Sequence, residues 1–86
     1  MNATTFLFHE DPGHGWLEVP LSFLFELNIQ NKITPYSYKG DNKVYLEEDC
    51  DMSTFHSAYK TKYGICPEID IVYYNDDCFI RSLRHF

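Results

Sequence analysis

Two histidines and two carboxylates lie close together near the start of the chain, in His9–Trp16 with the sequence HEDPGHGW. Imidazole titrates near neutral pH, so together with carboxylates it can form an acid–base pair or bind a divalent metal ion. The spacing matches no established metal-binding signature, and a histidine that hydrogen-bonds the turn backbone is a simpler interpretation. A small-ligand or metal-binding site is therefore an alternative prediction, with the candidate residues His9, Asp11, His14 and Trp16. The leading interpretation assigns no metal ion and no cofactor.

A second group of carboxylates comprises Glu47, Glu48, Asp49 and Asp51, between a predicted strand and a predicted helix. One interpretation is that acids near a helix N-terminus interact favourably with the helix dipole and cap the helix. The other is an acidic surface that binds a basic region of another protein. Cys50 lies inside this run, so the surrounding charges should raise its pKa and make it a poor nucleophile.

The overall charge also favours a protein partner. The chain of 86 residues has 13 acidic and 7 basic side chains, and residues 1–31 contain no Lys or Arg. A net charge of −6 argues against binding to nucleic-acid phosphates as the main activity. Tyrosine is enriched where proteins meet, so exposed tyrosines complete the predicted surface. The candidate partner-binding residues are Glu47, Glu48, Asp49, Asp51, Tyr36, Tyr38 and Tyr74, and the expected partner is a protein with a basic surface.

Common catalytic motifs are missing from the sequence. It contains no Gly-rich phosphate loop, no Gly-x-Ser-x-Gly elbow and no His-Glu-x-x-His motif. The cysteines Cys50, Cys66 and Cys78 have no Cys-x-x-Cys spacing, which favours reduced thiols over disulfides or zinc ligation. No signal peptide is recognised, and no apolar run approaches the roughly 18–20 residues of a membrane-spanning helix. We therefore expect a non-enzymatic, cytoplasmic protein that does not bind membranes.

Hydrophobic periodicity predicts the elements that position these groups. Residues 4–19 are expected to form a hairpin whose tip is residues 11–15, because Pro and Gly there favour a turn. Pro20 and the apolar spacing that follows predict a short helix over residues 20–27, with Asn28 as a left-handed C-cap. This helix is apolar on most sides, so a partner or a second copy of the chain could cover it. A homodimer is therefore left open.

The second half of the chain repeats this order. Residues 33–38 and 43–47 are predicted to form a second hairpin, with Tyr36 and Tyr38 on one face. A helix from Asp51 or Ser53 to Tyr63 is expected to end at Gly64. Residues 69–74 and 78–83 predict a third hairpin. The sequence thus indicates a single α+β domain over residues 1–86, an antiparallel sheet of hairpins with two short helices in the order ββαββαββ.

The C-terminal residues Arg81–Phe86, RSLRHF, form the only cationic cluster in the sequence. Cations on an edge strand block unwanted pairing between sheets, which is the simplest interpretation. The alternative is that Arg81 and Arg84 pair with acidic side chains, within the chain or across a homodimer.

Three segments, FHEDPGHGWLEVP, ITPYSY and KVYLEEDCD, occur in this order within residues 6–55. In these segments the chain resembles a group of small uncharacterised proteins encoded by phages and other bacterial mobile elements. The resemblance implies a mobile-element source, a bacterial host cell and an accessory role, and it supplies no catalytic residues. Combined with the acidic surface, it predicts an inhibitor that binds a host protein, such as a defence protein.

Overall fold

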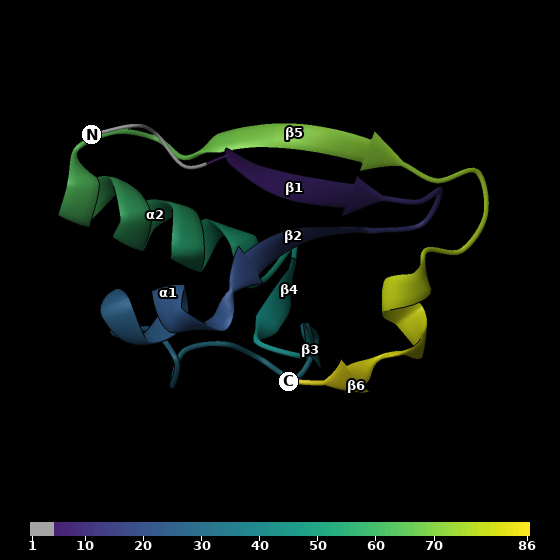
Figure 1. Ribbon diagram of the computed structural model, residues 1–86, viewed down its shortest axis with the longest axis horizontal. Coiled ribbons are helices and arrows are strands. Elements are labelled where there is room, and N and C mark those ends of the chain that lie inside the picture. The colour runs from purple at the N-terminus through teal and green to yellow at the C-terminus, as the bar shows by residue number, and fades with distance from the viewer. Residues whose placement is uncertain (1–4) are drawn as a thin grey trace.

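Six strands form one sheet in the computed structural model of the chain, which describes residues 5–86 (Figure 1). The strands lie side by side in the order β5-β1-β2-β4-β3-β6. This confirms the predicted α+β class and the order of its elements. In chain order these are β1 (Thr5–Glu10), β2 (Gly15–Pro20), α1 (Leu21–Glu26), β3 (Tyr38–Gly40), β4 (Lys43–Glu47), α2 (Met52–Tyr63), β5 (Glu68–Tyr73), a 3-10 helix (Phe79–Ser82) and β6 (Arg84–His85).

Residues in the left-handed conformation follow both helices and take part in the β3–β4 turn. Gly64 ends α2 with φ 76°, which a residue without a side chain adopts at low cost. Asn28 follows α1 with φ 56°, as expected from its tolerance of this region. Asn42 has φ 58° and forms the two-residue turn between β3 and β4 with Asp41. These positions confirm both helices and the β3–β4 turn.

The predicted third hairpin is wrong. β5 pairs with β1 in parallel, from Thr5 opposite Glu68 to Glu10 opposite Tyr73, so the sheet is mixed rather than antiparallel. β6 pairs with β3 at the other edge of the sheet, and Figure 1 shows the chain passing from the end of β5 round to β6. The intervening residues form a 3-10 helix instead of a strand, because burial of Ile80 against the sheet outweighs their local strand pattern.

The first strand of the second hairpin is also shorter than expected. β3 begins only at Tyr38, and residues 33–37 form turns instead of a strand. The carboxylate of Asp51 holds these turns, because it accepts hydrogen bonds from the backbone and hydroxyl of Thr34 and from the hydroxyl of Ser37. Tyr36 is therefore on an exposed turn and does not share a strand face with Tyr38.

Apolar side chains cover both faces of the sheet. The strand residues Phe6, Phe8, Leu17, Val19, Val44 and Leu46 pack with Leu24, Phe55 and Tyr59 from α1 and α2. The smaller opposite cluster comprises Trp16 and Tyr45 from the sheet with Cys78 and Ile80 from the C-terminal segment. The C-terminal segment, residues 74–86, therefore acts as the cover of the second face. Within residues 5–86, no helix is both long enough and apolar enough to cross a membrane.

Candidate functional site

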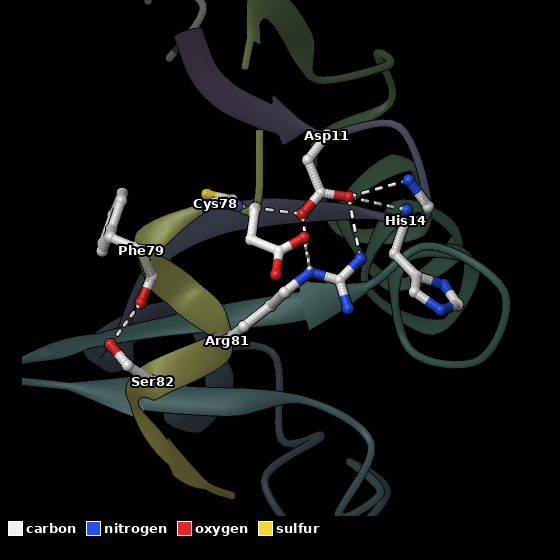
Figure 2. A network of polar contacts seen from close by, with 8 residues as sticks. Asp11, His14, Cys78, Phe79, Arg81 and Ser82 are labelled. Atoms are coloured by element: carbon white, nitrogen blue, oxygen red, sulfur yellow. Dashed lines mark hydrogen bonds and ion pairs between the residues drawn. The ribbon is translucent and has the colours of Figure 1, made fainter. Parts of the chain in front are cut away.

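Asp11 organises the turn between β1 and β2 (Figure 2). Its side chain is fully buried, and one carboxylate oxygen accepts the backbone N–H groups of Gly13 and His14 at 2.9 and 3.0 Å. The other oxygen accepts the backbone N–H of Cys78 at 2.9 Å. Arg81 donates to both oxygens, from Nε at 2.7 Å and from Nη2 at 2.9 Å. Asp11 is therefore a structural anchor between the turn and the C-terminal segment.

The charge of this anchor is strongly stabilised. The guanidinium of Arg81 holds the pKa of Asp11 well below its usual range, against the opposing effect of burial, and the backbone donors lower it further. In return the Asp11 carboxylate raises the pKa of Arg81. The Arg81 guanidinium also lies 5.2 Å from the centre of the Trp16 ring, a cation–π distance. The predicted pairing of a C-terminal arginine with an acid of the same chain is thus present at Arg81.

The structure divides the four residues of the predicted ligand site into two pairs, His9 with Asp11 and His14 with Trp16. His9 is buried, and its two ring nitrogens are hydrogen-bonded to the Tyr74 hydroxyl at 2.9 Å and to Glu18 at 3.0 Å. His9 and Asp11 therefore have their polar atoms engaged within the protein, and we correct their assignment as ligand-binding residues. His14 is exposed, and its ring points away from Asp11 in Figure 2. Trp16 is buried, with its indole ring 6.0 Å from the His14 ring.

Two of the predicted partner-binding acids are also buried. Asp51 has no exposed surface and is occupied with Thr34 and Ser37, so it neither caps α2 with its side chain nor faces a partner. Glu47 is only 9% exposed, and its Oε2 accepts the backbone N–H groups of Asp49 and Cys50 at 3.0 and 2.9 Å. Burial removes Asp51 from the predicted surface and leaves Glu47 only a small part in it.

A cavity of about 360 Å³ brings together residues from both predicted sites. Trp16 of β2 lies beside Glu47 of β4, and Tyr38 of β3 lies beside His85 of β6, through strand pairing. The side chains of Trp16, Tyr38, Glu47 and His85 lie on the sheet face that the C-terminal segment covers, and Arg81 of that segment borders the cavity. The full lining is His14, Trp16, Tyr36, Tyr38, Glu47, Asp49, Cys50, Arg81 and His85.

One end of this cavity is acidic. His14, Glu47 and Asp49 each place one potential metal-ligand atom within 4.8 Å of the others. The pKa of Glu48 is raised, first by partial desolvation and then by the neighbouring carboxylates of Asp49, Glu10 and Glu47. Desolvation, a hydrogen bond to Glu47 and then the neighbouring carboxylate charges raise the pKa of Cys50, in the predicted direction, so its thiol is a poor nucleophile at neutral pH. This end of the cavity therefore favours a cation.

Two predicted contact residues do not reach the cavity. Glu48 is exposed beside the cavity-lining acids without lining the cavity itself. Tyr74 is half-buried outside the cavity lining, and its hydroxyl is bonded to His9, the neighbour of Trp16 on β1. Sequence reasoning missed Arg81 and His85 as cavity residues, because no local pattern predicts that the C-terminal segment crosses the sheet to β3.

Comparison of the chain with protein-family models, with curated proteins and with solved structures finds no significant match. The functional argument therefore depends on the geometry of the cavity.

Proposed function

We propose that the protein is a binding protein rather than an enzyme, and that it captures a basic side chain of a partner protein in the cavity. The observation that carries this proposal is that Tyr36, Tyr38 and the carboxylates of Glu47 and Asp49 line one cavity. Aromatic faces attract cations, and carboxylates form charge-assisted hydrogen bonds with Lys and Arg side chains. A cavity with both features fits a lysine or arginine side chain.

The charges around the cavity support this choice. Arg81 also borders the cavity, but its Nε and Nη2 are bonded to Asp11, so its charge is balanced inside the protein. The carboxylates of Glu47, Glu48 and Asp49 are not balanced by an ion pair among the described residues. The net charge of −6 adds a long-range attraction that speeds encounter with a basic surface.

The shape of the cavity rim favours a macromolecule over a free small molecule. Tyr36 is 68% exposed on the turn before β3, where an approaching protein can cover its ring. A protein that covers Tyr36 and inserts one cationic side chain would bury both the ring and the acids. Such binding blocks the basic surface of the partner. The resemblance to phage proteins supports a role as an inhibitor of a bacterial host protein in the cytoplasm, such as a defence protein.

An affinity experiment with matched variants tests the proposal. The wild-type protein, the Tyr36→Ala/Asp49→Lys variant and the control Asp76→Lys are immobilised and exposed to bacterial lysate in EDTA at low and high salt. Asp76 is exposed on the turn after β5, outside the cavity, so this control reverses a charge elsewhere. We expect a specific protein to be retained by wild type and control, with weaker retention at high salt, and lost from the cavity variant. Equal retention on all three proteins at both salt concentrations would contradict the proposal.

A defined probe tests the chemistry without knowledge of the partner. N-acetyl-lysine methylamide and N-acetyl-arginine methylamide are titrated into labelled protein and followed by amide chemical shifts, with the neutral glutamine analogue as control. We expect shifts at Tyr38, Asp49 and Cys50 for the cationic probes alone. Shifts spread evenly over the surface, or the same for glutamine, would refute a cation-selective cavity.

A further inference from the structure

We infer that His14, Glu47 and Asp49 form a binding site for one divalent transition-metal ion, of the Zn²⁺ or Mn²⁺ type. The three side chains come from the β1–β2 turn, the end of β4 and the loop before α2, and one ligand atom of each lies within 4.8 Å of the others. Donors that are about 2.0–2.2 Å from a shared ion lie roughly 3–4 Å apart. His14 and Asp49 are exposed, so their side chains have room to close the remaining distance when an ion binds. This inference does not depend on the proposed function.

Glu47, a member of the cluster, is held in place by the backbone of the following loop. It is nine-tenths buried and lines the cavity, and its Oε2 takes both backbone hydrogen bonds. No nitrogen donor among residues 5–86 reaches its Oε1, and only the Cys50 thiol, a weak donor, lies beside this carboxylate. A buried carboxylate is costly without a compensating charge. A metal ion bound at the Oε1 side of this carboxylate would supply that charge.

Trp16 provides an observation that is independent of the three proposed ligands. Its side chain is 98% buried and lines the same cavity, yet its indole N–H has no hydrogen-bond acceptor among the described residues. Buried N–H groups nearly always have an acceptor. A water molecule on a metal ion held by His14, Glu47 and Asp49 offers such an acceptor, since three protein ligands leave at least one coordination position open.

The local structure prepares His14 for this role. Asp11 fixes the backbone N–H of His14, and the imidazole nitrogens make no hydrogen bond to another described residue (Figure 2). The ring is therefore held near the cavity with both nitrogens free for a ligand. One imidazole with two carboxylates is a mixed nitrogen–oxygen set, which suits Zn²⁺ or Mn²⁺ better than Mg²⁺ or Ca²⁺, because the latter prefer oxygen ligands.

Calorimetry on EDTA-treated, full-length protein tests the site, with ZnCl₂, MnCl₂, MgCl₂ and CaCl₂ as probes. We expect one Zn²⁺ per chain with micromolar or tighter affinity, weaker Mn²⁺ binding at the same site, and no saturable binding of Mg²⁺ or Ca²⁺. His14→Ala and Asp49→Asn should each weaken Zn²⁺ binding at least tenfold. Both side chains are exposed and make no hydrogen bonds through their side chains to described residues, so these variants should keep the wild-type circular dichroism spectrum.

The matched controls are His56→Ala on α2 and Asp76→Asn after β5, which remove the same chemical groups outside the cluster. They should bind Zn²⁺ like wild type, and so should Cys50→Ser, because the thiol is not in the donor set. Absence of stoichiometric binding, or wild-type affinity in His14→Ala and Asp49→Asn, would overturn the inference. Loss of binding in His56→Ala or Cys50→Ser would assign the metal to other donors and overturn it as well. The affinity experiment in EDTA tests partner capture without metal, so the two proposals can fail separately.

Discussion

Replacement of Asp11 by Asn is the sharpest test of how the turn and the C-terminal segment are held together. Asn has almost the same shape, but it has no charge, and one of its two terminal atoms is a donor instead of an acceptor. In the native structure both carboxylate oxygens accept only N–H groups, three from the backbone and two from Arg81. Whichever way the amide lies, its NH₂ group meets donors, and at least two of them lose their acceptor.

The magnitude follows from burial. Removal of one partner from a buried ion pair costs about 3–5 kcal/mol of unfolding free energy. Asp11 is fully buried while the Arg81 side chain is 33% exposed, so solvent compensates part of the loss and we expect about 3 kcal/mol. At this chain length such a loss lowers Tm by roughly 12 °C or more. It is a large share of the roughly 4–13 kcal/mol expected for the whole domain.

Urea denaturation followed by Trp16 fluorescence measures the effect, because this single tryptophan is buried beneath Arg81. A double-mutant cycle with Arg81→Met isolates the ion pair, and a coupling energy of at least about 1 kcal/mol is expected. Asp77→Asn is the matched control. Asp77 lies 3.8 Å from Arg81 Nε but is 88% exposed, so its loss should change the unfolding free energy by less than about 0.5 kcal/mol.

Two results would refute this reasoning. If Asp11→Asn unfolds within about 1 kcal/mol of wild type, the buried carboxylate does not anchor the C-terminal segment in the way the hydrogen bonds indicate. If Asp77→Asn is as destabilising as Asp11→Asn, a general loss of negative charge near Arg81 explains the effect, and the specific network does not.

Three further predictions follow from the same structure. Folding lowers the pKa of Asp11, so the ionised carboxylate stabilises the folded state fully at pH values above the unfolded pKa of about 3.9. This stabilisation is lost progressively as the pH falls from that value toward the lower pKa of the folded state. The gap in urea midpoint between wild type and Asp11→Asn should therefore be largest near pH 7 and narrow at pH 2–3; a constant gap would contradict this. Asp51→Asn should lower the unfolding free energy by about 2–4 kcal/mol, and hydrogen exchange should show loosening of residues 33–37; unchanged exchange there would refute the assigned role. Gly15→Ala should cost about 1–3 kcal/mol in urea denaturation, because its new methyl would lie 2.2 Å from the buried Phe8 ring, whereas a neutral result would show that the ring moves freely.

The local elements could be predicted because their signals are local. Pro20 before α1, Gly64 after α2 and the Pro-Gly turn after Asp11 each act within a few residues, and the structure has the expected element at each. The Pro-Gly turn likewise places the strands of the first hairpin correctly over residues 5–19, while residue 4 of the predicted hairpin lies outside the described residues.

The errors arise where distant residues decide the conformation. Residues 78–83 are predicted to be a strand of a third hairpin, yet Ile80 is buried against the second face of the sheet, and the main chain adopts a 3-10 helix there. Residues 33–37 also read as a strand, but the carboxylate of Asp51 holds them as turns across a separation of 17 residues from Thr34. Neither partner can be recognised from the segment itself, because the decisive contact is made with residues far away in the sequence.

Contacts between distant residues also explain why the sequence predicts two separate sites, the His9–Trp16 turn and the acidic surface, where the structure has one cavity. The turn His9–Trp16 and the acids after β4 are about 30 residues apart in sequence, but β2 pairs with β4 so that Trp16 lies opposite Glu47. This register places His14 beside Asp49 and makes one acidic, aromatic-lined cavity from two weak local signals. A metal ion and a basic side chain would then use the same carboxylates, and each would neutralise the charge that attracts the other. Occupancy of the cavity by a metal ion should therefore weaken the binding of a basic partner, because both ligands need the carboxylates of Glu47 and Asp49.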